Sequence, residues 1–256
     1  MSSLISTCIK PPCADDYCVD LRTAQGVLLG CFNSSNTVCA FSLPSLQPIH
    51  AFPTNSSSVL SEIASSDSNQ VFWSDRSGTI GSIDLRSGQS STHISTNEEI
   101  FSIDTAGFNL ASSSNKQVSV YDIRTYKPIQ QYTELYADEN DILCVRIHKI
   151  NTNWVLSCCE DSLMAFCDVN SIEDDNYNLI NVEESALKVG FINDNVFCVT
   201  LNSIVAYDIK HNDPDAPLES LHKYKLNDFQ SRNPEIDYFI DEFYGSDHTI
   251  LAGTHS

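Results

Sequence analysis

The sequence predicts an all-β fold made of a repeated unit of four short strands, and three observations predict it. The first is a short phrase that recurs about every forty residues and contains an aspartate in four of its five copies. Successive copies are 42, 38, 46 and 40 residues apart, at the aligned positions Ser42, Asp84, Asp122, Asp168 and Asp208. A fixed period in this range is typical of folds built from stacked supersecondary repeats.

The second observation is a predicted hairpin in every repeat. Each aspartate closes an apolar stretch that alternates as a strand does, for example at 118–121 and 204–207. About ten residues upstream lies another strand-like run that ends in small residues, at 71–74, 109–112, 154–157 and 196–199. The segments between these runs are rich in Asn, Asp, Ser and Gly, which favour hairpin turns because they tolerate positive φ or cap their own backbone.

The third observation is a pair of flanking strands. A first strand precedes each hairpin, and its predicted centres are Val19, Ile63, Ile103, Val145, Val189 and Ile240. A more polar fourth strand follows each aspartate phrase, at 48–52, 91–94, 128–132 and 178–182. Two of these polar strands contain proline, which is tolerated at the edge of a sheet. Four strands with a polar outermost strand describe one blade of a β-propeller.

On these residues the chain resembles the WD-repeat β-propeller family. Phrases such as Tyr121-Asp122-Ile123-Arg124 stand where the family has its Trp-Asp dipeptide, and the resemblance covers nearly the whole chain. No repeat has Trp before Asp, and none has a clear Gly-His pair ahead of its first strand. The resemblance therefore implies that the family's internal hydrogen-bond tetrad is degraded and that apolar packing stabilises the blades.

The repeats predict an incomplete ring. Five of them are complete, and a sixth supplies only a first strand near 238–242 and a second strand at 249–253. The family usually has seven blades and closes the ring with an N-terminal strand. We therefore expect residues 1–256 to form a single, partial propeller domain, short by about one and a half blades, as in a truncated product.

Charge points to the class of partner. The net charge is −20; residues 1–128 carry 11 acids and 7 bases, or −4, and residues 129–256 carry 23 acids and 7 bases, or −16. This excess disfavours direct binding of nucleic acid, which depends on Lys and Arg. Solubility alone is the simpler explanation, but an acidic surface also steers basic partners.

The resemblance places many of these acids on one side of the propeller. In the family, the loops from a fourth strand to the next first strand lie on one face, together with the turns between second and third strands. We expect a basic segment of a partner protein to bind the acids predicted there, above all Asp138, Glu139, Asp141, Glu183 and Glu184. A second acidic cluster, which includes 173–175 and Asp213, is predicted on the opposite face.

An alternative partner follows from the arginines. The phrases at 83–86 and 121–124 resemble the W-D-x-R ending by which some WD-repeat proteins dock on the adaptor of a cullin–RING ubiquitin ligase. Only Asp84, Arg86, Asp122 and Arg124 match that ending, because the Trp is absent. The simpler interpretation is that each arginine caps a strand end and pairs with a nearby carboxylate.

The sequence offers little for catalysis or cofactors. It lacks the nucleophile-elbow, phosphate-loop, dinucleotide and zinc-protease motifs. Asp75 and Asp161 could imitate the calcium-binding acids of propeller enzymes, but each falls in a predicted hairpin turn, and His148 is expected to be structural. We predict no metal and no cofactor.

The ten cysteines fall mainly at strand positions and show no C-x-x-C spacing, so we expect buried, reduced thiols. The N-terminus lacks a basic segment followed by a long apolar run, which indicates an intracellular protein, cytoplasmic or nuclear. The sequence therefore predicts a non-enzymatic scaffold for protein–protein interaction. A ubiquitin-ligase substrate receptor is the second hypothesis, and a propeller enzyme is the third.

Overall fold

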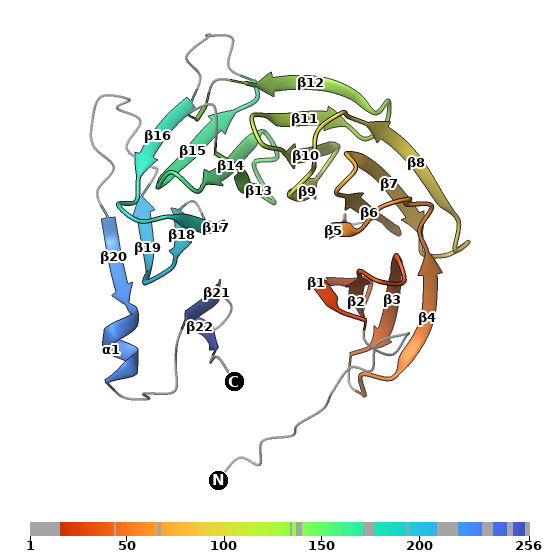
Figure 1. Ribbon diagram of the computed structural model, residues 1–256, viewed down its shortest axis with the longest axis horizontal. Helices are drawn as coiled ribbons and strands as arrows, with labels where there is room; N and C mark the ends of the chain where they lie inside the picture. Colours follow the sequence, from red (N-terminus) through yellow and green to blue (C-terminus); the bar gives the residue numbers. More distant parts are fainter. Residues whose placement is uncertain are drawn as a thin grey trace.

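A computed structural model of the chain describes residues 16–43, 45–65, 68–133, 135–136, 140–170, 177–193, 195–208, 220–231, 238–244 and 248–253. Antiparallel sheets of four consecutive strands follow one another around an arc (Figure 1). The first sheet holds β1 (Cys18–Ala24), β2 (Val27–Phe32), β3 (Thr37–Ser42) and β4 (Pro48–Pro53). The second holds β5 (Leu60–Ser65), β6 (Gln70–Asp75), β7 (Thr79–Asp84) and β8 (Ser90–Ser95).

The next three sheets repeat this order. The third holds β9 (Ser102–Ala106), β10 (Asn109–Ser113), β11 (Val118–Asp122) and β12 (Lys127–Tyr132). The fourth holds β13 (Ile142–Ile147), β14 (Trp154–Cys159), β15 (Leu163–Asp168) and β16 (Tyr177–Asn181). The fifth holds β17 (Ala186–Ile192), β18 (Asn195–Thr200), β19 (Ser203–Asp208) and β20 (Ser220–Lys225), and the short helix α1 (Leu226–Gln230) follows β20.

A two-stranded sheet of β21 (Tyr238–Tyr244) and β22 (His248–Gly253) follows. Among the described strands, neither of these two pairs with β1, so the arc of sheets is open (Figure 1). The prediction of five complete four-stranded blades and part of a sixth, in an open ring, is confirmed.

The strands take the radial order that their polarity predicts. β1, β5, β9, β13, β17 and β21 lie nearest the middle of the arc, and the fourth strands lie outside (Figure 1). In β12, for example, five of six residues are exposed, whereas every residue of β9 and β10 is buried. An outer strand has only one neighbour to pair with, so water can solvate its polar side chains.

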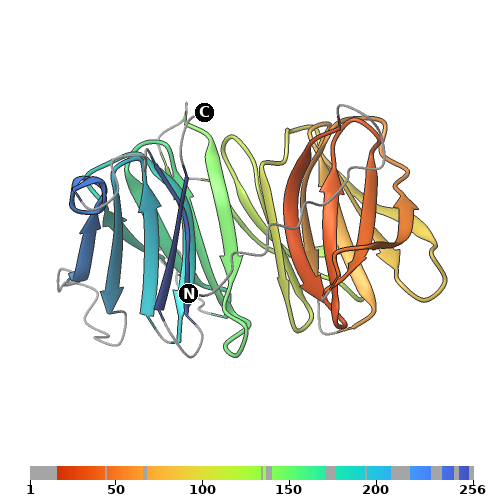
Figure 2. The same ribbon diagram turned by 90° about the horizontal axis from the view of Figure 1, so that it is seen from below.

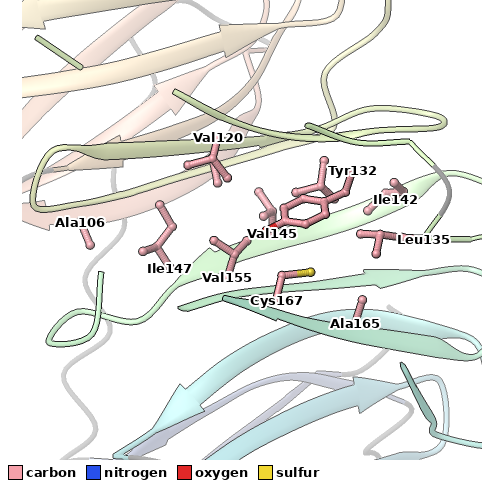
Figure 3. Packing of buried hydrophobic residues seen from close by; sticks show 12 residues of the cluster. Ala106, Val120, Tyr132, Leu135, Ile142, Val145, Ile147, Val155, Ala165 and Cys167 are labelled. Atoms are coloured by element: carbon pink, nitrogen blue, oxygen red, sulfur yellow. The ribbon is translucent and has the colours of Figure 1, made fainter. Parts of the chain in front are cut away.

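Apolar packing between neighbouring sheets holds the arc together. Separate clusters lie between the first and second sheets, the second and third, the third and fourth, and the fourth and fifth. Figure 3 shows the third of these, where Val120 and Tyr132 of the third sheet meet Val145 and Val155 of the fourth. The expectation that apolar contacts stabilise the blades agrees with this arrangement.

One pair of residues shows how volume is matched within a blade. Trp73 of β6 is fully buried and lies opposite Gly81 of β7. A Cβ atom on Gly81 would come within 2.5 Å of the Ser91 carbonyl oxygen and closer still to the Trp73 ring. The glycine therefore makes the room that the indole occupies.

One predicted strand centre is shifted. Spacing made Val19 the counterpart of Ile63, but a register irregularity lies between Cys18 and Asp20, as it does between Leu60 and Glu62. Asp20 is therefore the counterpart of Glu62, and Leu21 takes the place predicted for Val19. The first two blades thus carry the same irregularity 42 residues apart, and it aligns their first strands where the spacing of apolar centres does not.

Candidate functional site

The loops that carry the predicted acids meet at one rim of the arc. The backbone N–H of Glu160, in the β14–β15 turn, donates to the carbonyl oxygen of Asp141 (3.4 Å), and the N–H of Val182 donates to the carbonyl oxygen of Ser162 (2.9 Å). This turn therefore joins the β12–β13 loop to the β16–β17 loop. We call the surface formed by Asp141, Glu160, Asp161 and Glu183 the acidic face; in Figure 2 the strands run between two rims, of which this is one.

The predicted partner-binding residues do not share one environment. Asp138 and Glu139 lie outside the described residues. Asp141 is half-buried at the start of β13, and the Glu183 side chain is 79% exposed. Glu183 also adopts a left-handed backbone (φ 68°), stabilised by an N–H bond to the Asn181 side chain (2.8 Å).

Two of these acids already have partners within the chain. The Lys223 ammonium of β20 lies 3.1 Å from the Glu183 carboxylate. Glu184 accepts a hydrogen bond from the Thr200 hydroxyl (2.6 Å) and from the Asn202 N–H (3.2 Å). Glu184 therefore ties the β16–β17 loop to the β18–β19 turn inside one blade.

The contact of Glu184 has counterparts in other blades. Glu98 accepts a bond from the Ser114 hydroxyl (2.6 Å), and Asp75 accepts one from the Ser56 hydroxyl (2.6 Å). In each case a carboxylate links the loop before a first strand to the turn after a second strand. Carboxylate–hydroxyl bonds thus join these loops and turns in addition to the apolar packing that the sequence predicted.

The residues considered for catalysis have structural contacts. Asp75 also accepts the backbone N–H groups of Ser77 (2.9 Å) and Thr79 (3.0 Å), as a turn aspartate does. Buried His148 bonds through Nε2 to the Asn193 carbonyl oxygen (2.7 Å), and its Nδ1 accepts the N–H of Asn151 (2.8 Å). Both ring nitrogens of His148 are therefore occupied.

The alternative docking residues lie at the opposite rim, where third strands turn into fourth strands. Asp84 accepts the N–H of Arg86 (2.8 Å), and backbone hydrogen bonds from Ser87 and Arg86 lower the pKa of Asp84. Asp122 binds Arg124 through both carboxylate oxygens (2.6–3.2 Å), and this contact lowers the Asp122 pKa. Arg124 thus pairs with the nearby carboxylate as the simpler interpretation holds, whereas Asp84 binds the backbone N–H groups of Arg86 and Ser87, and adaptor docking stays a prediction.

Sequence spacing missed a network of charges on the innermost strands. Glu62 of β5 is buried, and its Oε1 lies 2.6 Å from Nη2 of Arg22 in β1 and 2.9 Å from Nη2 of Arg146 in β13. Its Oε2 accepts bonds from the Ser102 hydroxyl (2.5 Å) and the Ile103 N–H (2.8 Å) in β9. One carboxylate therefore connects four blades, reaching a residue 84 positions away.

A repeated contact runs through the same strands. The Asp20 carboxylate accepts the N–H of Ile63 in the next blade (3.2 Å), and Asp104 accepts the N–H of Ile147 (2.9 Å), as Glu62 does with Ile103. The Lys149 ammonium also forms an ion pair with the Asp104 carboxylate, with Nζ 2.9 Å from Oδ1. The sequence did contain a signal for this network, namely charged residues inside otherwise apolar first strands. Such residues are rarely buried without a partner of opposite charge.

The pKa values in this network diverge. Burial raises the pKa of Asp20 to about 6 although Arg22 lies beside it. Burial also opposes the charge of Glu62 and Asp104, but Arg146 and Arg22 around Glu62, and Lys149 and Arg146 around Asp104, hold both pKa values below their ordinary range. Of the three acids, Asp20 is thus the one whose negative charge the surrounding residues stabilise least.

This difference predicts the pH dependence of stability. A carboxyl whose pKa is higher in the folded chain contributes stability below its unfolded pKa and loses that contribution as pH rises through the folded value. Asp20 should therefore make the free energy of unfolding decline between its ordinary pKa of 3.8 and about 6. We expect Asp20→Asn to remove this decline, because asparagine keeps an oxygen for the Ile63 N–H.

Urea titrations of the wild type and of Asp20→Asn at a series of pH values check the prediction. An unchanged slope between those two pH limits in the variant would contradict it. Glu62 and Asp104 have the opposite sign, since groups with lowered pKa values lose their stabilisation only as pH falls through those values.

Among the residues that the structure describes, no group of three or more His, Cys, Asp or Glu side chains could hold a metal ion. No helix in the described ranges is both long and apolar enough to cross a membrane.

Comparison with known proteins places the fold. No family model matches the chain. The sequence is similar to a WD repeat-containing protein 89 homolog of Dictyostelium discoideum, with 29% identity over 220 residues, which are 78% of this chain and 57% of that relative. The chain thus spans little more than half the length of this curated relative.

A solved structure gives the same fold. The chain superposes on a chain of a crystal structure of the mitotic checkpoint complex with a TM-score of 0.75, over 96% of this chain and 80% of that chain, at 13% identity. At that identity the likeness shows the fold alone. The two comparisons together support a WD-repeat family.

Proposed function

We propose that this WD-repeat β-propeller, whose fold supports a role as a protein-interaction scaffold, binds a basic segment of a partner protein on its acidic face. The observation that carries the proposal is the convergence of three acidic loops. The backbone bonds at Glu160 and Val182 bring Asp141, Glu160, Asp161 and Glu183 to one rim, although Asp141 and Glu183 are 42 residues apart.

The electrostatics favour a basic ligand. Gathered like charges repel one another and create a negative potential that attracts positive segments. The described bases on this rim are few: Arg76 pairs with Glu99 (3.1 Å), Lys223 pairs with Glu183, and Lys116 and Lys225 are exposed. A basic partner could replace Lys223 at Glu183, because that carboxylate is mostly exposed.

The proposal assigns different roles to neighbouring residues. Asp141 and Glu183 of the acidic face are proposed contacts, together with Asp138 and Glu139, which precede Asp141 in the sequence. Glu184 is a positioning residue, because its carboxylate is engaged by Thr200 and Asn202. A variant that includes Glu184 would therefore confuse a loss of binding with a disturbed loop.

Binding of a fluorescent peptide rich in lysine and arginine tests the proposal. We expect the variant with Asp138→Asn, Glu139→Gln, Asp141→Asn and Glu183→Gln to bind on the order of tenfold more weakly at low salt, since each exposed ion pair contributes about 0.2–1 kcal/mol. The wild-type affinity should fall as ionic strength rises, because salt screens exposed charges. Fluorescence anisotropy at two salt concentrations measures both effects.

A charge-matched control separates this face from bulk charge. Glu173→Gln, Asp174→Asn, Asp175→Asn and Asp213→Asn remove four acids that the sequence assigns to the opposite loops. We expect this variant to retain most of the wild-type affinity. Equal losses in both variants, or no loss in either, would show that the acidic face is only a solvated surface.

A further inference from the structure

The fourth blade contains two buried thiols in direct cross-strand opposition. Cys144 of β13 pairs in register with Cys158 of β14. Directly opposed residues of an antiparallel pair project to the same side, with Cα atoms about 4.5–5.5 Å apart. This separation lies within the range of about 4.4–6.8 Å that disulfides span.

Both thiols face the same neighbour. The Cys144 sulfur lies 4.0 Å from the Val189 carbonyl oxygen, and the Cys158 sulfur lies 3.7 Å from the Ala186 carbonyl oxygen, both in β17. Both belong to the apolar cluster between the fourth and fifth sheets. The side chains therefore share one face of the hairpin as well as one register position.

The two thiols differ in acidity. A hydrogen bond from the Cys158 thiol and the positive charge of Arg146 lower the pKa of Cys144 to about 7, against the effect of burial. Burial raises the pKa of Cys158 well above its ordinary value. Cys144 is thus the thiol that ionises first, and thiolates are the nucleophilic form of cysteine.

We propose that Cys144 and Cys158 form a reversible disulfide when the protein meets a small peroxide. The Cys144 thiolate attacks one oxygen of hydrogen peroxide, the O–O bond breaks, and the released hydroxide takes a proton to become water. The Cys158 sulfur then attacks the Cys144 sulfenic acid, an S–S bond forms, and a second water leaves. Two thiols are oxidised by two electrons, and one peroxide is reduced to two waters.

A small oxidant is required because Cys144 is 3% exposed and Cys158 is fully buried. Cys144 lies on an innermost strand, two residues from Arg146 of the central charge network. The proposal is independent of the acidic face, so its failure would leave the proposed function untouched.

Peptide mapping of the native chain tests the proposal. After treatment with hydrogen peroxide and alkylation of free thiols, non-reducing mass spectrometry should show a Cys144–Cys158 cross-link, and dithiothreitol should reverse it. Of the ten cysteines, the denatured protein should then lose two titratable thiols to the cross-link, in addition to the one lost where Cys18 is oxidised. Oxidation of exposed Cys18 reports that the oxidant was effective.

Single substitutions assign the pair. Cys159→Ser is the matched control, because Cys159 is the next residue of β14 and pairs with Ile142 instead; this variant should still form the cross-link. In Cys158→Ser the Cys144 sulfenic acid lacks its partner thiol and should be trapped by dimedone. If Cys158→Ser does not fold, the non-reducing peptide maps of the wild type and of Cys159→Ser still show whether Cys144 and Cys158 are joined.

Three outcomes would overturn the proposal. One is the absence of the cross-link when Cys18 is oxidised. Another is a link that forms only in urea. The third is a link from either residue to Cys198, the remaining thiol of the same cluster.

Discussion

Replacing Glu62 by alanine is expected to lower the free energy of unfolding by about 3–5 kcal/mol. The substitution leaves the guanidinium groups of Arg22 and Arg146 in the centre of the arc without the carboxylate that they share. It also removes the acceptor of the Ser102 hydroxyl and the Ile103 N–H. Arg22 keeps the Asp20 carboxylate at 3.2 Å, so the loss falls mainly on the largely buried Arg146, and an unpaired buried charge costs far more than the loss of an exposed ion pair.

Urea denaturation, monitored by circular dichroism, measures this effect, and two further variants serve as comparisons. Glu62→Gln should be milder than alanine, because it keeps an oxygen for the Ile103 N–H. Glu160→Gln removes an exposed carboxylate of the acidic face and should change stability by no more than about 0.5 kcal/mol. A loss below about 1 kcal/mol in Glu62→Ala would show that the network contributes little to stability.

Substituting Gly81 by valine should destabilise the second blade by about 1–3 kcal/mol or more. The added atoms would collide with the Trp73 ring, which is fully buried, and with the Ser91 backbone of the outer strand. Neither neighbour can withdraw easily, because the indole is packed in the interface with the first blade and Ser91 is held in β8.

Thermal and urea unfolding of Gly81→Val, with Gly81→Ala as the smaller step, tests the prediction. Glycine 26 offers a steric control, since a Cβ atom there would meet nothing within 4 Å; its left-handed backbone (φ 78°) leaves only a conformational cost for Gly26→Ala. The explanation also requires coupling: adding Trp73→Phe to Gly81→Ala should cost less than the sum of the two single changes. Strict additivity would mean that the glycine is not there to admit the indole.

The central network bears on function through geometry. Glu62 connects strands of four successive blades, and the carboxylates of Asp20 and Asp104 tie β1 to β5 and β9 to β13. The loops at both rims are extensions of these blades. Rigid elements hold a binding surface more precisely than mobile loops do, so the network holds β13, and with it the loop of Asp141, in place against the first three blades.

The sequence by itself determined the strand order and the polarity of the blades. The recurring aspartates, from Asp84 to Asp208, mark third-strand ends in the structure, and the polar runs such as 128–132 form outer strands. These features depend on neighbours along the chain: a turn needs only a few adjacent residues, and a strand shows its burial as a period of two. The same locality explains why Asp84 and Asp122 act on residues two positions away.

Only the tertiary structure decided which side chains share an environment. It separated Glu183, which is exposed, from Glu184, which binds Thr200, although the two are adjacent and chemically alike. It brought Arg146 to Glu62 across 84 residues and set Cys144 opposite Cys158. Contacts between blades depend on the pairing register of several strands at once and on the irregularities within them. A shift of one residue in the register of a strand turns every one of its side chains to the other face of the sheet. The periodicity of the sequence cannot encode that choice, because many registers satisfy the same period.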